Sequence, residues 1–323
     1  GKELGLVKDE SQVYDCSKMG NVSDEEFEEI LGETTVFARV TPEDKFRLLT
    51  LMKKQEITAM TGDGVNDVPA LANAHIGIAM GSGPSIVQDA GDIVLLDDNF
   101  KSVVTAMKEG RVVLTNIRRM LMYLLATNAG EVLTIIVALL LGGEHLLLPI
   151  QILWVNLVTD SLMVVPIGLE PPEEYFLRQK PEKKDAPILN GVLLGRMIII
   201  AITMAAITIT TYFVSEEFFT HEQANTLTFT ALVVMQWANA FNSRALHDSL
   251  FKRLKTHNWK FWAALVPAIL LQVAALFTNV GHEFLHTVSV PMLALGIVAV
   301  VSFIIPIVIV EIHKLFVKKF VKN

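Results

Sequence analysis

The chain has 323 residues, of which 52% are hydrophobic and 19% are charged, and its mean hydropathy is +0.46. These values exclude an ordinary soluble protein, and the charged residues near the start exclude a chain that lies wholly in a membrane. The net charge of −7 does not identify a partner, because the acidic residues gather mostly in the first part of the chain. We therefore predict a soluble part followed by a membrane part.

The start of the chain and its cysteine content restrict the compartment and the metal chemistry. Residues 1–20 contain no apolar core of the length that a signal peptide needs, so we expect the soluble part to remain in the cytosol. Cys16 is the sole cysteine, which excludes an internal disulfide and the usual soft-metal ligand sets.

The first hundred residues alternate apolar strings with helical patterns, which predicts an α/β layer with a parallel sheet. Strands are expected over residues 35–40, 56–60, 76–80 and 92–96, and helices over residues 24–31, 42–54, 69–74 and 84–90.

The strand at 56–60 is followed by the string TGDGVNDVPAL, residues 61–71. Its two glycines allow a tight turn at the C-terminal end of a strand, where open α/β sheets bind ligands. The turn presents Asp63, Asn66 and Asp67, and Pro69 suits the start of the next helix.

The strand at 35–40 is followed by TPEDK, residues 41–45. Thr41 is a suitable helix cap, and Lys45 lies near the positive end of the helix, a favourable place for a phosphate. Carboxylates and a lysine at neighbouring strand ends suggest magnesium and a phosphoryl group. The alternative is a plain loop with capping residues, and MGSGPS, residues 80–85, favours a turn over a phosphate cradle.

A helical pattern begins near Lys101 and continues into the first long apolar stretch, with only Gly110 as a weak point. One long helix is therefore expected to run from the soluble part into the bilayer. The alternative is a short amphipathic helix and a separate span that meet near Arg118.

Six apolar stretches are each near the length of about 20 residues that a membrane-spanning helix needs. They cover residues 118–141, 148–168, 191–214, 225–243, 259–278 and 289–311. The loops after the second and fourth stretches and the tail carry Lys and Arg, whereas the other three loops carry none. The positive-inside rule then places both ends of the chain in the cytosol.

Several of these stretches contain polar side chains, which are costly in hydrocarbon and normally face a partner or a cavity. They recur at spacings of three or four residues, which predicts one helix face for each group: Asn128 and Glu131; Asn156, Thr159 and Asp160; Gln236 and Asn239. All supply oxygen ligands, which favours a hard cation, and calcium over magnesium. The alternative for any one of them is an interhelical hydrogen bond, and for Gln236 or Asn239 alone the two readings stay equally open.

In this order, FARVTPEDK, MTGDGVNDVPAL, IGIAMGSG, LLDDNF, NAGEV and QILWVNLVTD make the chain resemble the C-terminal half of a P-type cation-transporting ATPase of the calcium-pump branch. The resemblance implies an α/β haloacid-dehalogenase-like, Rossmann-type partial domain followed by an all-α bundle of six transmembrane helices. The expected division is residues 1–100 for the phosphorylation domain, 101–117 for a helical stalk and 118–323 for the membrane domain.

The resemblance also implies roles for individual residues. Asp63 helps to hold Mg²⁺, Asn66 and Asp67 support the phosphoryl site, and Lys45 contacts the transferred phosphate. Ligands of the transported cation are expected at Asn128, Glu131, Asn156, Thr159, Asp160 and Gln236. At Gln236 pumps that carry two calcium ions have Glu, so one ion per cycle is expected, as in plasma-membrane-type relatives.

The family's phosphorylated aspartate lies in an Asp-Lys-Thr-Gly-Thr motif that does not occur in this sequence. We therefore expect the missing N-terminal half of the pump, which binds most of the ATP, to be a partner, together with membrane lipid and without nucleic acid. The expected function is ATP-driven export of Ca²⁺ through a phosphoenzyme cycle. Two alternatives remain: a truncated, non-catalytic regulator or binding module, and a pump for Na⁺ or another cation.

Overall fold

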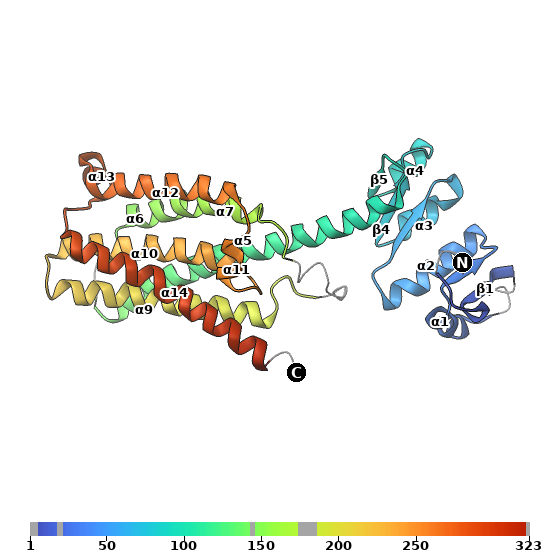
Figure 1. Ribbon diagram of the computed structural model, residues 1–323, viewed down its shortest axis with the longest axis horizontal. Helices are drawn as coiled ribbons and strands as arrows, with labels where there is room; N and C mark the ends of the chain where they lie inside the picture. Colours follow the sequence, from blue (N-terminus) through green and yellow to red (C-terminus); the bar gives the residue numbers. More distant parts are fainter. Residues whose placement is uncertain (1–5, 18–21, 143–145, 174–185, 321–323) are drawn as a thin grey trace. The chain divides into compact units, whose positions relative to one another are not determined.

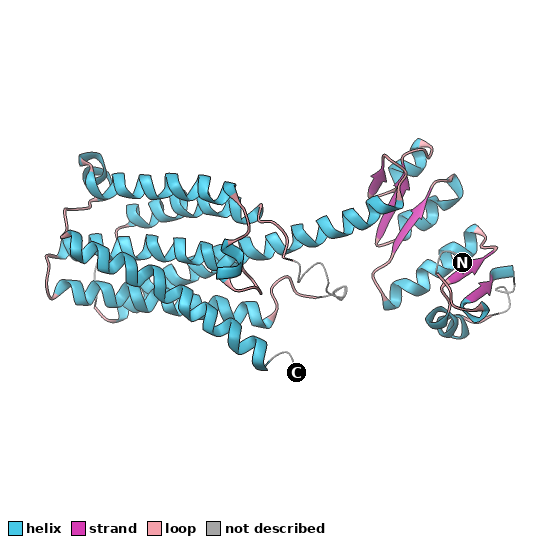
Figure 2. Cartoon of the chain, viewed as in Figure 1, coloured by secondary structure: helices cyan, strands magenta, loops and turns pink. Residues whose placement is uncertain are grey.

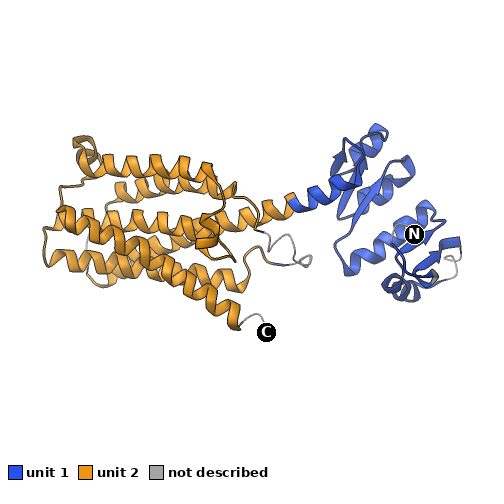
Figure 3. Cartoon of the chain, viewed as in Figure 1, with its two compact units in different colours: residues 1–108, 180–186 blue, residues 109–179, 187–323 orange. Residues whose placement is uncertain are grey.

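The computed structural model describes residues 6–17, 22–142, 146–173 and 186–320 (Figure 1). The chain forms two compact units, one made of residues 1–108 with 180–186 and the other of residues 109–179 with 187–323 (Figure 3). The first unit contains strands and short helices, and the second is helical (Figure 2).

The first unit contains two small parallel sheets. In one, β1 (Val13–Asp15) pairs with β2 (Val36–Ala38), and in the other the strand order is β3 (Ala59–Gly62), β4 (Ile76–Met80), β5 (Ile93–Leu95). The connecting helices are α1 (Asp24–Glu33), α2 (Pro42–Gln55), α3 (Val68–Asn73) and α4 (Ser85–Ala90), with short 3₁₀ turns at Glu10–Gln12 and Val65–Asp67.

The strands are parallel as predicted, but they form two sheets, because β2 pairs with a short strand that the sequence pattern did not reveal. The third strand begins at Ala59, three residues after its predicted start. The reason lies in Glu56, whose backbone N–H still bonds to the carbonyl of Met52 and closes α2.

Side-chain caps fix where the first two long helices begin. Ser23 and Glu26 form a capping box at the start of α1, and Thr41 and Asp44 form one at the start of α2, where Pro42 occupies the first turn. Each cap contributes about 1 kcal/mol. The cap of α2 therefore fixes the turn that carries Lys45.

The second unit begins within α5, a single helix from Phe100 to Leu140, so the predicted long helix is present. The helices that follow are α6 (Pro149–Trp154), α7 (Ser161–Gly168), α9 (Gly191–Glu216), α10 (His221–Arg244), α11 (Leu250–Leu254), α12 (Trp259–Phe277), α13 (Asn279–Leu285) and α14 (Met292–Phe320). Between α6 and α7 the backbone is π-helical over Val155–Asp160, so the predicted second span is one helix with a π segment in its middle.

Five helical segments among the described residues are long and apolar enough to cross a membrane. They are Phe100–Leu140, Pro149–Gly168, Gly191–Glu216, Trp259–Phe277 and Met292–Phe320. The predicted span at 225–243 lies inside α10, which is not among them because it carries several Thr and amide side chains. Every residue from Ala224 to Arg244 is buried, since α10 packs against α7, α9 and α14 (Figure 1).

Two buried glutamates after α7 tie the helical unit together. Glu170 accepts hydrogen bonds from Arg244 Nε at 3.0 Å and from Arg253 Nε at 3.1 Å. Glu173 pairs with Arg119 Nη2 at 2.6 Å and also accepts a bond from the backbone N–H of Leu246. The network therefore joins α5, the end of α10 and α11.

Glu173 predicts how the stability of this unit depends on pH. Burial acts to raise the pKa of Glu173, but the Arg119 guanidinium and backbone N–H bonds outweigh it and hold the pKa below its usual value. A carboxyl whose pKa is lowered by folding contributes stability above its unfolded pKa, and this contribution is lost as the pH falls through the folded pKa.

Glu173→Gln should lower the free energy of unfolding at pH 7 by roughly 3 kcal/mol, because Arg119 loses its buried partner. It should also flatten the decline in stability below about pH 4. Denaturant unfolding of the full chain in detergent at several pH values measures both effects. Glu217→Gln, at an exposed position, is the control; equal behaviour of the two variants would contradict the assignment.

Candidate functional site

The first candidate site lies where β3 ends. Lys45, in the first turns of α2, reaches Asp67 with its Nζ 2.6 Å from Oδ1. Asp67 is buried, whereas the Lys45 side chain is 37% exposed. The structure thus brings together two of the side chains predicted for the phosphoryl site, and the lysine retains an exposed edge.

The turn after β3 leaves Asp63 and Asn66 exposed at the C-terminal end of the three-stranded sheet. A Cβ atom on Gly62 would lie 2.6 Å from the Cβ of Asp67, so only glycine lets the strand approach that side chain. A Cβ on Gly83 would lie 3.1 Å from the carbonyl oxygen of Asp63, which shows that the turn after β4 closes on the turn after β3. The oxygen ligands of this edge belong to a compact, glycine-dependent arrangement.

Asp98, for which the sequence pattern predicted no role, is a further residue at this edge. Its Oδ1 accepts a hydrogen bond from the Ser82 backbone N–H at 3.1 Å, and its φ is +49°. The bonds from the Ser82 backbone and hydroxyl hold the pKa of Asp98 below its usual range. The adjacent acids in LLDDNF were the available signal, but their spacing does not indicate which one turns back onto the loop after β4.

The second candidate site lies inside the helical unit, around Glu131 of α5. Asn156 Nδ2 donates to Glu131 Oε2 at 3.0 Å, and Gln236 Nε2 donates to Glu131 Oε1 at 2.8 Å. Glu131 is 4% exposed and Gln236 is fully buried. Side chains from α5, the π segment and α10, far apart in the sequence, therefore meet at one carboxylate.

Asp160 lies at the end of the π segment and also faces α5. Its Oδ1 accepts from Tyr123 Oη at 2.8 Å and its Oδ2 from Thr127 Oγ1 at 3.4 Å. Tyr123, Thr127 and Glu131 are four residues apart, so they follow one face of α5. Asp160 therefore contacts α5 one turn before Glu131, on the same face of that helix.

The predicted ligands thus divide into those that the structure brings together and one that it does not. Asn156 contacts Glu131, and Thr159 is buried beside Asp160 in the same π segment. Asn128 instead is exposed, and its Nδ2 donates to the Leu124 carbonyl of its own helix at 2.8 Å. The spacing of three residues predicted a shared helix face for Asn128 and Glu131, but Asn128 lies toward the edge of that face.

Buried amide oxygens of the second site indicate which kind of ligand it could bind. The Oε1 atom of Gln236 and the Oδ1 atom of Asn239 are buried and have no hydrogen-bond partner among the residues that the structure describes. Among the described residues no three His, Cys, Asp or Glu side chains gather as a metal site, so this cluster is made of two acids and neutral oxygen groups. Such a mixed set suits a hard cation better than a soft one.

The helical part of the sequence also contains residues that were not predicted as part of this site, Tyr123 and Thr127. The sequence feature that could have identified them is their spacing of four residues, which places them on the same face of α5 as Glu131. Tyrosine and threonine are common in packed membrane helices, however, and nothing in the sequence shows that both hydroxyls reach Asp160.

Comparison with known proteins identifies the kind of domain to which each unit belongs. Residues 144–316 match the model of the family described as cation transporting ATPase, C-terminus, and residues 47–107 match that of haloacid dehalogenase-like hydrolases. The first unit is thus a partial domain of the latter type, and the second is a membrane helical region.

Individual relatives agree with these matches. The chain is 34% identical to a calcium-transporting ATPase of Bacillus subtilis, over 94% of this chain and 35% of that protein. It is 34% identical to calcium-transporting ATPase 1 of Bacillus cereus, over 97% and 37%, and 35% identical to an endoplasmic reticulum-type calcium-transporting ATPase 3 of Arabidopsis thaliana, over 77% and 28%. The chain therefore spans about a third of the length of the relatives it matches.

The close approach of Gly62 to Asp67 gives a test of the first site. Gly62→Ala should push Asp67 away from Lys45 and destabilise the α/β unit by about 1–3 kcal/mol, because the added methyl group meets a side chain that is already packed. Gly64→Ala is the matched control, since its nearest neighbour would lie at 3.9 Å. Hydrogen exchange of β3 and α3 measures the effect; equal protection in both variants would show that the contact is unimportant.

Proposed function

This chain belongs to the family of cation-transporting ATPases, and on that premise we propose that it is the C-terminal portion of an ATP-driven pump that exports Ca²⁺ from the cytosol through a phosphoenzyme cycle. The observation that carries the proposal is the Glu131 carboxylate, buried in the helical unit and contacted by amides from two other segments. The relatives are calcium-transporting ATPases, which supports calcium as the cargo.

The proposed cation ligands are Glu131, Asn156, Thr159, Asp160 and Gln236, whereas Asn128, which is exposed and bonded to its own helix, is not among them. In the hydrogen-bonded arrangement Asn156 and Gln236 turn their NH₂ groups toward Glu131. To bind a cation, each amide rotates about its terminal torsion, which has a broad two-fold preference, and presents its oxygen instead. Because Gln236 is neutral, the site gathers two negative charges, which match one Ca²⁺ per cycle.

The proposed phosphoryl site uses the residues at the end of β3. Lys45 contacts the transferred phosphate with its exposed edge, Asp67 holds that lysine in position, and Asn66 lies on the exposed side of the same turn. The exposed carboxylate of Asp63 in a glycine-rich turn fits a hard cation, and we assign Mg²⁺ to it. Bound there, Mg²⁺ would neutralise charge that develops on the phosphoryl group.

The N-terminal half of the pump is the proposed partner, and it supplies the phosphorylated aspartate and most of the ATP-binding surface. In this proposal residues 1–100 belong to the phosphorylation domain, 101–117 to a stalk and 118–323 to the membrane domain. The continuous α5 carries the signal, because Glu131 and the partners of Asp160 all lie on it. Displacement of α5 changes the separation between Glu131 and Asp160, and with it the affinity for the cation.

The family and the five apolar segments make the chain a multi-pass integral membrane protein. We propose that α10 crosses the bilayer as a sixth span, shielded from lipid by its neighbours, and that both ends of the chain lie in the cytosol. The plasma membrane is the proposed location, since Gln236 is the feature expected of plasma-membrane-type pumps.

The position of α10 can be tested by cysteine labelling. If α10 crosses the bilayer, Glu217→Cys and Lys255→Cys should react with an impermeant thiol reagent from opposite sides of sealed vesicles, after Cys16→Ser removes the native thiol. Both positions are exposed and flank α10. Reaction of both from the same side would exclude the sixth crossing.

The two sites should fail in different ways in the complete pump. Asp160→Asn should abolish Ca²⁺-dependent phosphorylation by ATP and weaken Ca²⁺ binding by about tenfold or more, since a charged ligand is lost. Asp63→Ala should block phosphorylation while Ca²⁺ binding remains measurable. Radioactive calcium binding and acid-stable phosphoenzyme provide the two readouts, and unchanged calcium affinity in Asp160→Asn would remove that residue from the site.

A further inference from the structure

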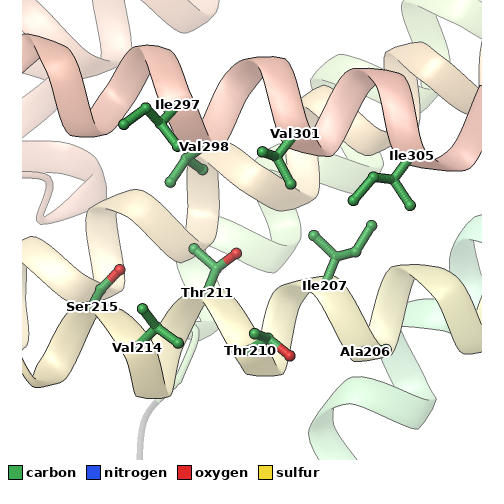
Figure 4. A pocket seen from close by; sticks show the side chains of 10 residues that line it. All are labelled: Ala206, Ile207, Thr210, Thr211, Val214, Ser215, Ile297, Val298, Val301 and Ile305. Carbon is green, nitrogen blue, oxygen red and sulfur yellow. The ribbon is translucent and has the colours of Figure 1, made fainter.

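A groove of about 390 Å³ lies between α9 and α14, away from the cation ligands (Figure 4). The wall formed by α14 is wholly apolar and includes Ile297, Val301 and Ile305, whereas the wall formed by α9 includes hydroxyl side chains. Both helices are membrane spans by length and composition, so the groove opens toward hydrocarbon. Its volume lies within the range of small-ligand sites, which is about 300–1,000 Å³.

The hydroxyl groups of the groove differ from others on the same helix. Thr203 and Thr208 donate to the carbonyls of Ile199 and Met204 at 2.7 and 2.8 Å, the usual way in which membrane helices satisfy such groups. Thr211 and Ser215 make no side-chain hydrogen bond within the described part of the chain, and Figure 4 shows both on the side of α9 that faces α14. Each is a donor in an apolar groove, and a ligand that carries an acceptor would satisfy it.

The charge at the outer end of the groove restricts the ligand further. Glu217, two residues after Ser215, is exposed, whereas the carboxylate of Glu216 already contacts Tyr212 and His221. The sequence contains no Lys or Arg from residue 197 to residue 243. A negatively charged headgroup is therefore disfavoured next to this end, and an ammonium group is favoured. The proposed orientation places this end at the non-cytosolic surface.

We propose that the groove between α9 and α14 binds one acyl chain of a zwitterionic, ammonium-bearing glycerophospholipid. The chain lies along Val301 and Ile305, the ester carbonyl accepts hydrogen bonds from Ser215 and Thr211, and the ammonium group lies near Glu217. A transmembrane helix of a protein partner fits less well. From Ala206 to Ser215 the groove follows about 13 Å of α9, and a helix of that length would fill about 1,000 Å³.

The experiment uses the full chain reconstituted in vesicles of phosphatidylcholine with a phosphatidylethanolamine that carries a photoreactive group in its acyl chain. We expect more photolabel on peptides from residues 206–215 and 297–305 than on peptides from the exposed face of α12. Unlabelled phosphatidylethanolamine should compete several-fold better than phosphatidylglycerol. Equal competition by both lipids, or equal labelling of all lipid-facing helices, would overturn the proposal.

Matched variants connect the labelling to the groove. Val301→Trp fills the groove and should remove its labelling, whereas Val300→Trp changes an exposed neighbour on the same helix that does not line it and should leave labelling unchanged. Ser215→Ala and Thr211→Val preserve the helix and should each weaken competition by about threefold. If both tryptophan variants label alike, or the groove of the reconstituted chain stays unlabelled, it does not hold lipid, and a protein partner becomes its better occupant.

Discussion

A carboxylate buried among membrane helices must be stabilised by groups from its neighbours, and Glu131 is the residue on which the central helices converge. Glu131 is buried, and the amides of Asn156 and Gln236 supply hydrogen bonds that a buried carboxylate needs. These contacts also fix the lateral positions of α5, the π segment and α10, because none of the three can rotate freely without uncovering the charge. The same requirement explains why α10 is polar and yet buried: its amides serve α5, and the surrounding helices cover it.

The π segment determines how the second span meets α5. Within the π segment Asn156 and Asp160 are four residues apart, so they lie on one side of the span at different heights along it. Asn156 consequently reaches Glu131, while Asp160 reaches Tyr123 and Thr127. The two carboxylates thus meet the same face of α5 through different neutral partners, amides for Glu131 and hydroxyls for Asp160.

Sequence patterns predicted the features that depend on composition and local chemistry. The apolar stretches, the capped start of α2, the glycine turn at Asp63 and the long α5 all follow from residue type and spacing. The sequence could not show that β2 pairs with β1, that the second span contains a π segment, or that Asn128 is exposed, because each depends on packing between distant segments. Hydropathy identifies helices that present apolar side chains to lipid. It therefore identifies the five apolar segments but not α10, which packs against other helices.

The helical unit contains two pairs of buried acids, and their partners differ in charge. Glu170 and Glu173 pair with Arg244, Arg253 and Arg119, so their charge is compensated permanently, and removing it would leave buried guanidinium groups. Within the described part of the chain, the partners of Glu131 and Asp160 are neutral donors, so their negative charge is solvated but not cancelled. A cation can add to the second pair without displacing another cation, and the amides that now donate to Glu131 have oxygens to offer it. The difference in partners, more than the difference in burial, is therefore what separates the candidate transport site from the structural network.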